Sequence, residues 1–222
     1  MPFLLPGDIA VENFTTPLKI SSGLRHEGDQ IIAEQCGSLK SKNDTRILQS
    51  NPARYIPTTH DLVIGVVTDR LNENFRVEIG YSEYATLPYS EFESISKKNR
   101  PDIPIGGLVY CRVSLAGCNV EIELSCLSPQ NKPEGFGHLI GGYLVDVSIP
   151  FARELLKSKS TLLDSIAGII KYEIAIGVNG KLWINTDNPQ NTVFLACLLR
   201  KLSNVKSSAR QAVIQEALSA FS

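Results

Sequence analysis

Closely spaced carboxylates are the first candidates for acid–base chemistry in this sequence, and Glu121 and Glu123 form the pair nearest to such an arrangement. One residue separates them in a β-prone run, so their side chains are expected on the same face of one strand. A solvated outer face of an antiparallel sheet explains this spacing better than a catalytic pair does. We therefore predict no general acid or base here.

Histidines and common catalytic motifs give no sign of a metal centre or an activated nucleophile. None of the histidines stands in a spacing typical of metal ligands. The sequence contains no G-x-S-x-G motif and no phosphate-binding G-x-x-x-x-G-K loop. A catalytic site assembled from residues distant in the sequence is the alternative. We expect a protein that is not an enzyme and needs no metal or cofactor. The three histidines are His26, His60 and His138.

The cysteines favour a reducing, intracellular compartment, because an odd number of thiols without any C-x-x-C pair does not suit a disulfide framework. Cys111 and Cys126 lie between apolar neighbours in β-prone runs, which predicts small core side chains. No run approaches the roughly 18 apolar residues of a membrane-spanning helix, and the first residues lack a basic signal-peptide region. We expect neither a secreted nor a membrane protein. The five cysteines are Cys36, Cys111, Cys118, Cys126 and Cys197.

A short basic loop is the first candidate for contact with nucleic acid. It places Lys97, Lys98 and Arg100 within four residues, just before Pro101. The whole chain has 22 Lys and Arg against 23 Asp and Glu, a formal net charge of -1, so any attraction of phosphate groups must be local. Arg76 is expected to project outward from a neighbouring strand and to extend this basic stripe. An ordinary solvated loop is the alternative.

The second candidate is Gly177-Val178-Asn179-Gly180, which has the G-x-x-G pattern with which KH modules hold an RNA backbone. It lies between two β-prone runs, Tyr172–Ile176 and Lys181–Asn185, and Asn-Gly in that position is typical of a type I′ hairpin turn. The hairpin interpretation is favoured. We therefore assign Gly177, Asn179 and Gly180 to a structural turn.

The place where a KH clamp belongs is the connection between the first two predicted helices of the C-terminal region. There the chain has Lys157 and Lys159 but no glycine, so the close backbone approach that glycine permits is lost. The two lysines can still meet phosphate groups.

These residues are positioned by an α+β multi-domain architecture with three successive segments. Residues 1–56 alternate short β-prone runs with turn signals and predict a small antiparallel β domain that packs on a neighbour or a partner. Residues 57–127 predict a five-stranded OB-type barrel, with an open meander of the same strands as the alternative. Gly106-Gly107 would let the fourth strand turn the barrel corner. The expected strands are Leu62–Val67, Phe75–Ile79, Tyr84–Leu87, Leu108–Ser114 and Val120–Ser125.

Residues 128–222 predict a KH-type α/β domain, because after a linker-like stretch the elements follow the order β-α-α-β-β-α with a further helix. The helix over Thr192–Leu202 is amphipathic, with Val193 expected on the same apolar side as Leu195 and Leu199. The other expected elements are strands at Tyr143–Ser148, Tyr172–Ile176 and Lys181–Asn185, and helices at Phe151–Lys157, Leu162–Ile170 and about Ser207–Phe221.

Several short motifs, in order and spacing, resemble those of the cap subunits of the RNA exosome over nearly all 222 residues. No single motif is decisive, but their succession is specific. The motifs are Leu5-Pro6-Gly7-Asp8, Gly23-Leu24, Gly28-Asp29, Cys36-Gly37, Arg54-Tyr55-Ile56-Pro57, Asp61-Leu62-Val63-Ile64-Gly65, Phe92-Glu93, Lys98-Asn99-Arg100-Pro101, Gly107-Leu108-Val109-Tyr110 and Gly177-Val178-Asn179-Gly180-Lys181-Leu182-Trp183.

The resemblance implies an N-terminal β domain, an OB barrel of the S-one type and a KH domain without catalytic activity. It implies partners as well: the other cap subunits, a ring of RNase PH-like subunits that the cap stabilises, and single-stranded RNA on its way to a 3′-to-5′ nuclease. We expect no membrane and no DNA partner. The expected location is the nucleus and nucleolus, and also the cytoplasm.

One departure from the pattern concerns the stacking of bases. Barrels of this type generally carry an aromatic side chain on the second strand and a histidine on the third, where this chain has Arg76 and Pro88. Base–aromatic stacking is worth about 1–3 kcal/mol per base, so its loss leaves a salt-sensitive and sequence-tolerant contact. We predict weak RNA binding by the isolated chain and useful binding within the assembled cap. A stand-alone regulator that binds single-stranded RNA, and a purely structural clamp without RNA contact, remain alternatives.

Overall fold

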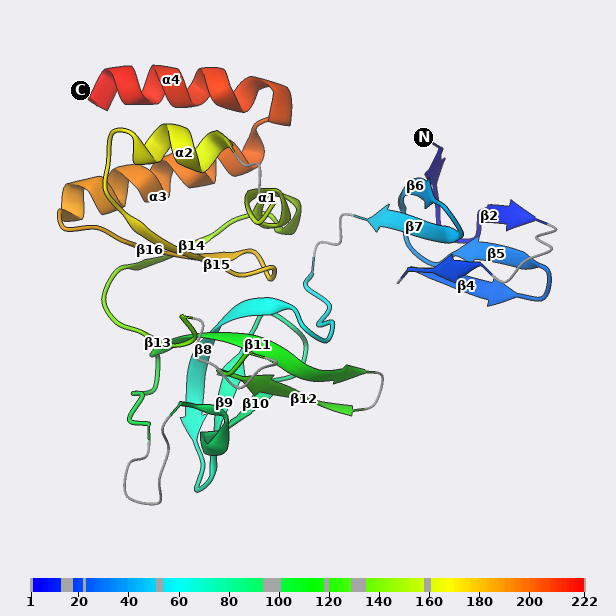
Figure 1. The fold of residues 1–222 in the computed structure, drawn as a ribbon, viewed down its shortest axis with the longest axis horizontal. Coiled ribbons are helices and arrows are strands. Elements are labelled where there is room, and N and C mark those ends of the chain that lie inside the picture. Colours follow the sequence, from blue (N-terminus) through cyan, green and yellow to red (C-terminus); the bar gives the residue numbers. More distant parts are fainter. Residues whose placement is uncertain are drawn as a thin grey trace. The chain divides into compact units, whose positions relative to one another are not determined.

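A computed structural model describes most of the chain, as two compact units at Met1–Pro52 and Ala53–Ser222 (Figure 1). Among the described residues, no helix is long and apolar enough to cross a membrane. The described residues are 2–12, 18–21, 23–50, 54–93, 101–117, 120–128, 135–157 and 161–221.

The first unit is built from short strands in two small sheets, ordered β1-β6-β7-β3 and β2-β5-β4. The pairing is antiparallel except between β3 and β7, which run parallel. Its core is small, with Leu24, Ile31 and Leu48 among the buried side chains. The strands are β1 (Phe3–Leu4), β2 (Ile9–Glu12), β3 (Lys19–Ile20), β4 (Leu24–Glu27), β5 (Gln30–Ala33), β6 (Gly37–Lys42) and β7 (Thr45–Ser50).

The second unit begins with the barrel, whose strands pair in the order β12-β10-β9-β8-β11 and close through a β11–β12 pairing. The β10–β12 pair is parallel, with Thr86 opposite Glu123. The closed ring confirms the barrel and excludes the open meander. Its elements are β8 (Leu62–Arg70), β9 (Asn74–Glu78), β10 (Ala85–Pro88), a 3-10 turn η1 (Tyr89–Glu91), β11 (Leu108–Gly117) and β12 (Val120–Ser125), with β13 (Gly137–Leu139) added at the side of β11.

The barrel closes around side chains that alternate along its strands. On β9, Phe75 and Val77 are fully buried while Arg76 between them is exposed. At the start of β11, a Cβ on Gly107 would lie 2.7 Å from Ile103 Cγ2 and 2.8 Å from the Pro104 carbonyl oxygen, so a larger residue would collide there. The glycine therefore permits the sharp approach to the barrel corner.

Two cysteines belong to the barrel core. Burial raises the pKa of Cys111 well above its ordinary value, and burial together with Glu91 raises the pKa of Cys126 to about 12. Both thiols therefore stay protonated at neutral pH and act as small core side chains.

The second unit ends in a three-stranded antiparallel sheet, ordered β14-β16-β15, with the helices on one side of it (Figure 1). Leu182 and Ile184 of the central strand contact the helical core, which includes Phe151 and Leu199. The order of the elements matches the expected KH-type domain. They are β14 (Tyr143–Asp146), α1 (Ile149–Leu155), α2 (Thr161–Ala167), β15 (Glu173–Ile176), β16 (Lys181–Asn185), α3 (Pro189–Asn204), the 3-10 turn η2 (Ser207–Ala209) and α4 (Arg210–Phe221).

Helix α3 corrects one detail of the sequence-based expectation. It begins at Pro189 because the Asn188 side chain accepts a hydrogen bond from the Gln190 N–H and caps the helix. Its buried stripe includes Leu195 and Leu199, as expected, but Val193 is 63% exposed. The prediction for Val193 was wrong, because at about 100° per residue Val193 lies roughly 200° around the helix from Leu195 and so outside the buried stripe.

Candidate nucleic-acid interface

The segment from Gly177 to Gly180 forms the turn between β15 and β16. The Gly180 N–H donates to the Gly177 carbonyl at 3.1 Å, and the Gly177 N–H donates to the Lys181 carbonyl at 2.9 Å. Gly180 has a φ of +81°, whereas Asn179 is not among the described residues with positive φ. A type I′ turn requires positive φ at both central residues, so the hairpin is present but its predicted type was wrong.

The central residues of the observed turn are Val178 and Asn179, and a β-branched residue such as Val178 disfavours the positive φ of a type I′ turn. The side chain of Asn179 is buried against the barrel. Its Nδ2 donates to the carbonyls of Ile64 and Ile79 at 2.8 and 2.9 Å. Its Oδ1 accepts from the Ile64 N–H at 3.3 Å. The neighbouring Val178 N–H donates to the Leu62 carbonyl at 2.7 Å. Contacts with the barrel thus occupy the turn, and its buried polar groups are not free to hold an RNA backbone.

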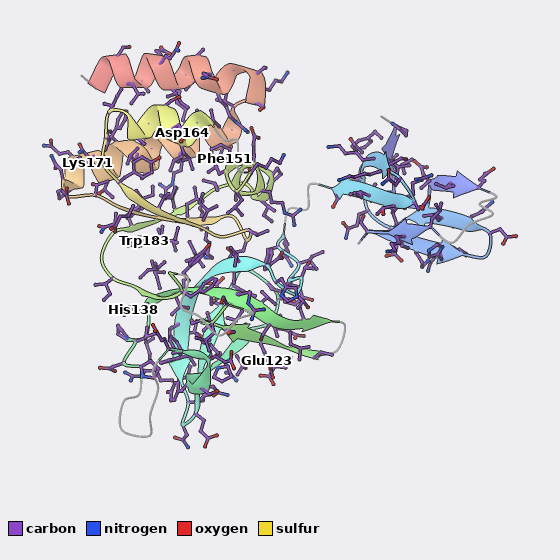
Figure 2. The ribbon with its side chains drawn as sticks, in the orientation of Figure 1. Glu123, His138, Phe151, Asp164, Lys171 and Trp183 are labelled. Atoms are coloured by element: carbon purple, nitrogen blue, oxygen red, sulfur yellow. The ribbon has the colours of Figure 1, made fainter. Side chains whose placement is uncertain are left out.

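The side of the KH-type sheet away from the helices is also occupied. Trp183, labelled in Figure 2, is 7% exposed, and its Nε1 donates to the Gly141 carbonyl at 2.9 Å. The Tyr110 hydroxyl on β11 donates to the Ile176 carbonyl at 3.5 Å. The Tyr110 contact joins the barrel to the KH-type sheet, whereas the Trp183 contact holds the segment that leads into β14 against that sheet.

Most of the predicted RNA-contacting cations fall where the structure gives no placement. Lys97, Lys98 and Arg100 lie outside the described residues, and so does Lys159. Lys157 is exposed immediately after α1. The structure therefore leaves the basic loop and the lysine pair as predictions.

Arg76 is described, and its surroundings were not foreseen. It is exposed on β9 opposite Thr86 of β10, and its guanidinium carbon lies 5.7 Å from the centre of the Tyr84 ring. Tyr84 is 53% exposed just before β10. The sequence analysis placed Tyr84 in the third strand and gave it no role. The sequence showed an aromatic residue at the start of that strand, but it did not show the β9–β10 register that brings this residue next to Arg76.

Carboxylates occupy the next strand of the same sheet. Glu121 and Glu123 are exposed on β12, which neighbours β10, and the Thr86 hydroxyl donates a hydrogen bond to Glu121 (Glu123 is labelled in Figure 2). The outer surface is thus positive at Arg76 and negative along β12.

Comparison with known proteins agrees with this two-part unit. The family model described as "Exosome complex component RRP40, S1 domain" matches residues 55–137, and a KH domain model matches residues 142–190. In the solved structures, a protein described as an exosome complex RNA-binding protein shares the fold, with a TM-score of 0.63, 17% identity, and coverage of 75% of this chain and 96% of that chain.

Full-length relatives extend the match to most of the chain. Exosome complex component RRP40 of Saccharomyces cerevisiae is 36% identical over 88% of this chain and 85% of its own length. The Schizosaccharomyces pombe rrp40 is 37% identical over 78% of this chain and 73% of its own length. The human RRP40 is 32% identical over 86% of this chain and 72% of its own length. The chain therefore belongs to the family of the exosome complex component RRP40.

Proposed function

We propose that this chain is a non-catalytic, RNA-binding cap subunit of an RNA exosome. It stabilises a ring of RNase PH-like subunits and lines the entrance path of single-stranded RNA to a 3′-to-5′ nuclease. The observation that carries the proposal is family membership, seen in 36% identity over 85% of the length of a yeast exosome complex component. A barrel of the OB type and a KH-type domain, both RNA-binding folds elsewhere, support it.

Within this function the barrel, rather than the KH-type turn, supplies the RNA contact. The turn uses Asn179 to bind the barrel, as the hydrogen bonds to Ile64 and Ile79 indicate. RNA then runs past the basic loop and Arg76, with Lys157 and Lys159 as a second place of phosphate contact. Such contacts depend on charge and are tolerant of sequence.

The absence of catalysis is part of the proposal. Glu121 accepts a hydrogen bond from Thr86 on an exposed strand, which suits a solvated surface. The buried thiols of Cys111 and Cys126 have raised pKa values, so neither is an available nucleophile at neutral pH.

Affinity purification of the tagged chain from cells, followed by mass spectrometry, tests the assignment to a complex. The expected result is recovery of RNase PH-like subunits and other cap subunits in comparable amounts. Fluorescence imaging of the same tagged chain is expected to show nuclear, nucleolar and cytoplasmic signal. Recovery of no RNase PH-like subunit, together with submicromolar binding of single-stranded RNA by the lone chain, would instead support a stand-alone regulator.

Charge reversal tests the RNA path in the assembled complex. The combined substitutions Lys97→Glu, Lys98→Glu and Arg100→Glu are expected to lower RNA crosslinking to the chain and to slow decay. The matched control reverses three exposed lysines of the KH-type domain, Lys171, Lys201 and Lys206, and is expected to change neither. Unchanged crosslinking and decay in the loop variant would favour a structural clamp.

A further inference from the structure

The pair formed by Arg76 and Tyr84 is the most exposed aromatic feature on the outer face of the β9–β10 hairpin among the residues that the structure describes. More than half of Tyr84 is accessible, at 53%. The guanidinium of Arg76 lies 5.7 Å from the ring centre, within the range of a cation–π contact. The arginine therefore restricts the ring while leaving much of its surface open.

The support beneath the pair is rigid. Arg76 lies opposite Thr86 in the β9–β10 ladder, and the Thr68 hydroxyl donates to the Arg76 carbonyl at 3.1 Å. The residues on either side of Arg76 along the strand, Phe75 and Val77, are fully buried in the barrel core. The backbone that carries Arg76 is thus held by the barrel. Tyr84 directly precedes Ala85, which is fully buried and pairs with Val77, so a partner need order little of this backbone on binding.

We infer that Tyr84 stacks against a base of single-stranded RNA, with Arg76 orienting the ring and placing a positive charge beside the adjacent phosphate. This inference rests on the proposed function. An aromatic face accepts any base, and an exposed ring beside a cation is the combination that sequence-tolerant binding of single strands uses. The pair thus restores, from the start of the third strand, a stacking surface that Arg76 and Pro88 do not themselves provide.

The neighbouring charges restrict where the phosphates of a bound RNA strand can lie on this surface. Glu121 and Glu123 are exposed on β12, on the other side of β10 from β9. Their carboxylates repel phosphate groups, whereas Arg76 on β9 attracts them. The RNA backbone therefore lies away from β12 and close to Arg76 itself, because Asp69 of β8 stands opposite Arg76 on the far side of β9.

A second tyrosine–arginine pair in the same unit provides a matched control. Arg200 lies 5.8 Å from the ring centre of Tyr143, which is 45% exposed at the edge strand of the KH-type sheet. This pair lies in the KH-type domain, and Asp187 lines the same groove. The two pairs have similar distances from guanidinium to ring, but Arg200 also donates a hydrogen bond to the Tyr143 hydroxyl at 3.4 Å, and the pairs lie in different domains.

The test uses the full chain and a short oligoadenylate that carries the fluorescent base 2-aminopurine at successive positions. Stacking on an aromatic ring quenches this base, so wild-type protein is expected to quench it at one or two positions. Tyr84→Ala is expected to remove the quenching and to weaken binding about tenfold, in line with the loss of one stacked base. Tyr84→Phe retains the ring and is expected to behave like the wild type, as is Tyr143→Ala.

A salt titration separates the roles of the two residues. Tyr84→Ala is expected to lower the affinity without changing the slope of log K against log salt. Arg76→Gln is expected to reduce the magnitude of that slope by about 0.7, the contribution of one phosphate contact in a single strand. Equal slopes for Arg76→Gln and wild type would show that Arg76 contacts no phosphate group.

The remaining outcomes distinguish this inference from the proposed function. If wild type binds the oligonucleotide and Tyr84→Ala binds equally well with the quenching intact, the stacking site is overturned while the proposed function stands. If Tyr84→Ala leaves RNA affinity unchanged but lowers recovery of ring subunits, the pair is a protein contact and the inference is again overturned. If neither the free chain nor the assembled complex binds RNA, the inference falls together with the proposed function.

Discussion

Asn179 is the residue that most directly links the KH-type domain to the barrel. A single side-chain amide makes three hydrogen bonds, to the N–H and carbonyl of Ile64 and to the carbonyl of Ile79. The residue is 8% exposed, so no solvent replaces these partners when the side chain is removed. A motif that has the pattern of an RNA clamp therefore acts in this molecule as a connection between domains.

We expect Asn179→Ala to lower the free energy of unfolding by about 3 kcal/mol, because it leaves buried donors and acceptors of the barrel unpaired. Asn179→Asp keeps the shape but places carboxylate oxygens against two carbonyls. The loss of unfolding free energy in this variant is expected to be larger at pH 7 than near pH 4. Burial favours the neutral acid, which can still donate one hydrogen bond. Urea unfolding at both pH values measures these effects.

The control for the charge change is Asn188→Asp at the start of α3. Asn188 caps that helix by accepting from the Gln190 N–H, and aspartate caps a helix as well as asparagine does. This variant is expected to keep wild-type stability. An Asn179→Asp protein as stable as Asn188→Asp at pH 7 would contradict the role assigned to the buried amide.

At the scale of elements, the β15–β16 turn depends on the absence of a side chain at Gly177. A Cβ there would lie 2.8 Å from the Ile64 backbone nitrogen and 3.1 Å from the Lys181 carbonyl oxygen. We expect Gly177→Ala to destabilise the protein by about 1–3 kcal/mol, the usual range for overpacking. The exchange rate of the Ile64 amide, measured by hydrogen exchange, should rise because its partner Asn179 is displaced.

Gly168→Ala is the matched control, since a Cβ at Gly168 has its nearest neighbours at 3.8 and 3.9 Å. Its effect on stability is expected to stay within about 0.5 kcal/mol, as for surface substitutions without a structural conflict. If both alanine variants unfold at the same denaturant concentration as the wild type, close packing of the turn against the barrel does not contribute to stability.

The last helix is attached to the first by a charged contact that makes stability depend on pH. Arg210 is 7% exposed and pairs with Glu154 at the end of α1, and Ser207 also donates to Glu154. Burial alone would raise the pKa of Glu154, but the hydrogen bonds from Arg210 and Ser207 and the charge of Arg210 lower it below its ordinary value of 4.5.

A carboxyl with a lowered pKa in the folded state stabilises the fold above its unfolded pKa, and that stabilisation is lost as the pH falls through the folded value. We therefore expect Glu154→Gln to be less stable than wild type at pH 7, and the two unfolding curves to converge below about pH 4.5. Thermal unfolding across this range checks the sign. Glu173→Gln changes an exposed glutamate, and its stability should differ less from that of the wild type at every pH. A stability difference between Glu154→Gln and wild type that does not change with pH would contradict a stabilising role of the ionised Glu154.

The elements that sequence patterns predicted best are those with strong periodicity. The alternation of Phe75, Arg76 and Val77 marked β9 because one barrel face is buried and the other exposed. The first unit was harder, because strands of two to six residues carry little pattern, and the parallel β3–β7 pair is invisible without tertiary contacts. The turn type at Asn179 was mispredicted because Asn179 and Gly180 were expected at the centre of the turn, whereas the hydrogen bond from Gly180 to Gly177 places Val178 and Asn179 there.

At the scale of the whole molecule, charge balance decides how RNA binding responds to salt. The chain carries a formal net charge of -1, so long-range attraction cannot assist the local contacts. If Lys97, Lys98 and Arg100 act together with Arg76 as four phosphate contacts, the slope of log K against log salt should be about -3 for a single strand. A protein bound through a diffuse positive surface would instead show a steeper dependence.

Comparing this slope among variants of the full chain shows how much of the RNA affinity comes from charge and how much from stacking. Charge reversal of the three loop cations should leave a slope of about -0.7, the part that belongs to Arg76, and should weaken binding most at low salt. Tyr84→Ala should weaken binding equally at all salt concentrations, because stacking releases no counterions. The loop variant and the tyrosine variant therefore separate the electrostatic from the stacking share of affinity in one protein. Equal slopes of log K against log salt for wild type and the loop variant would show that RNA does not pass the basic loop. Lys157 and Lys159 would then be the next cations to reverse.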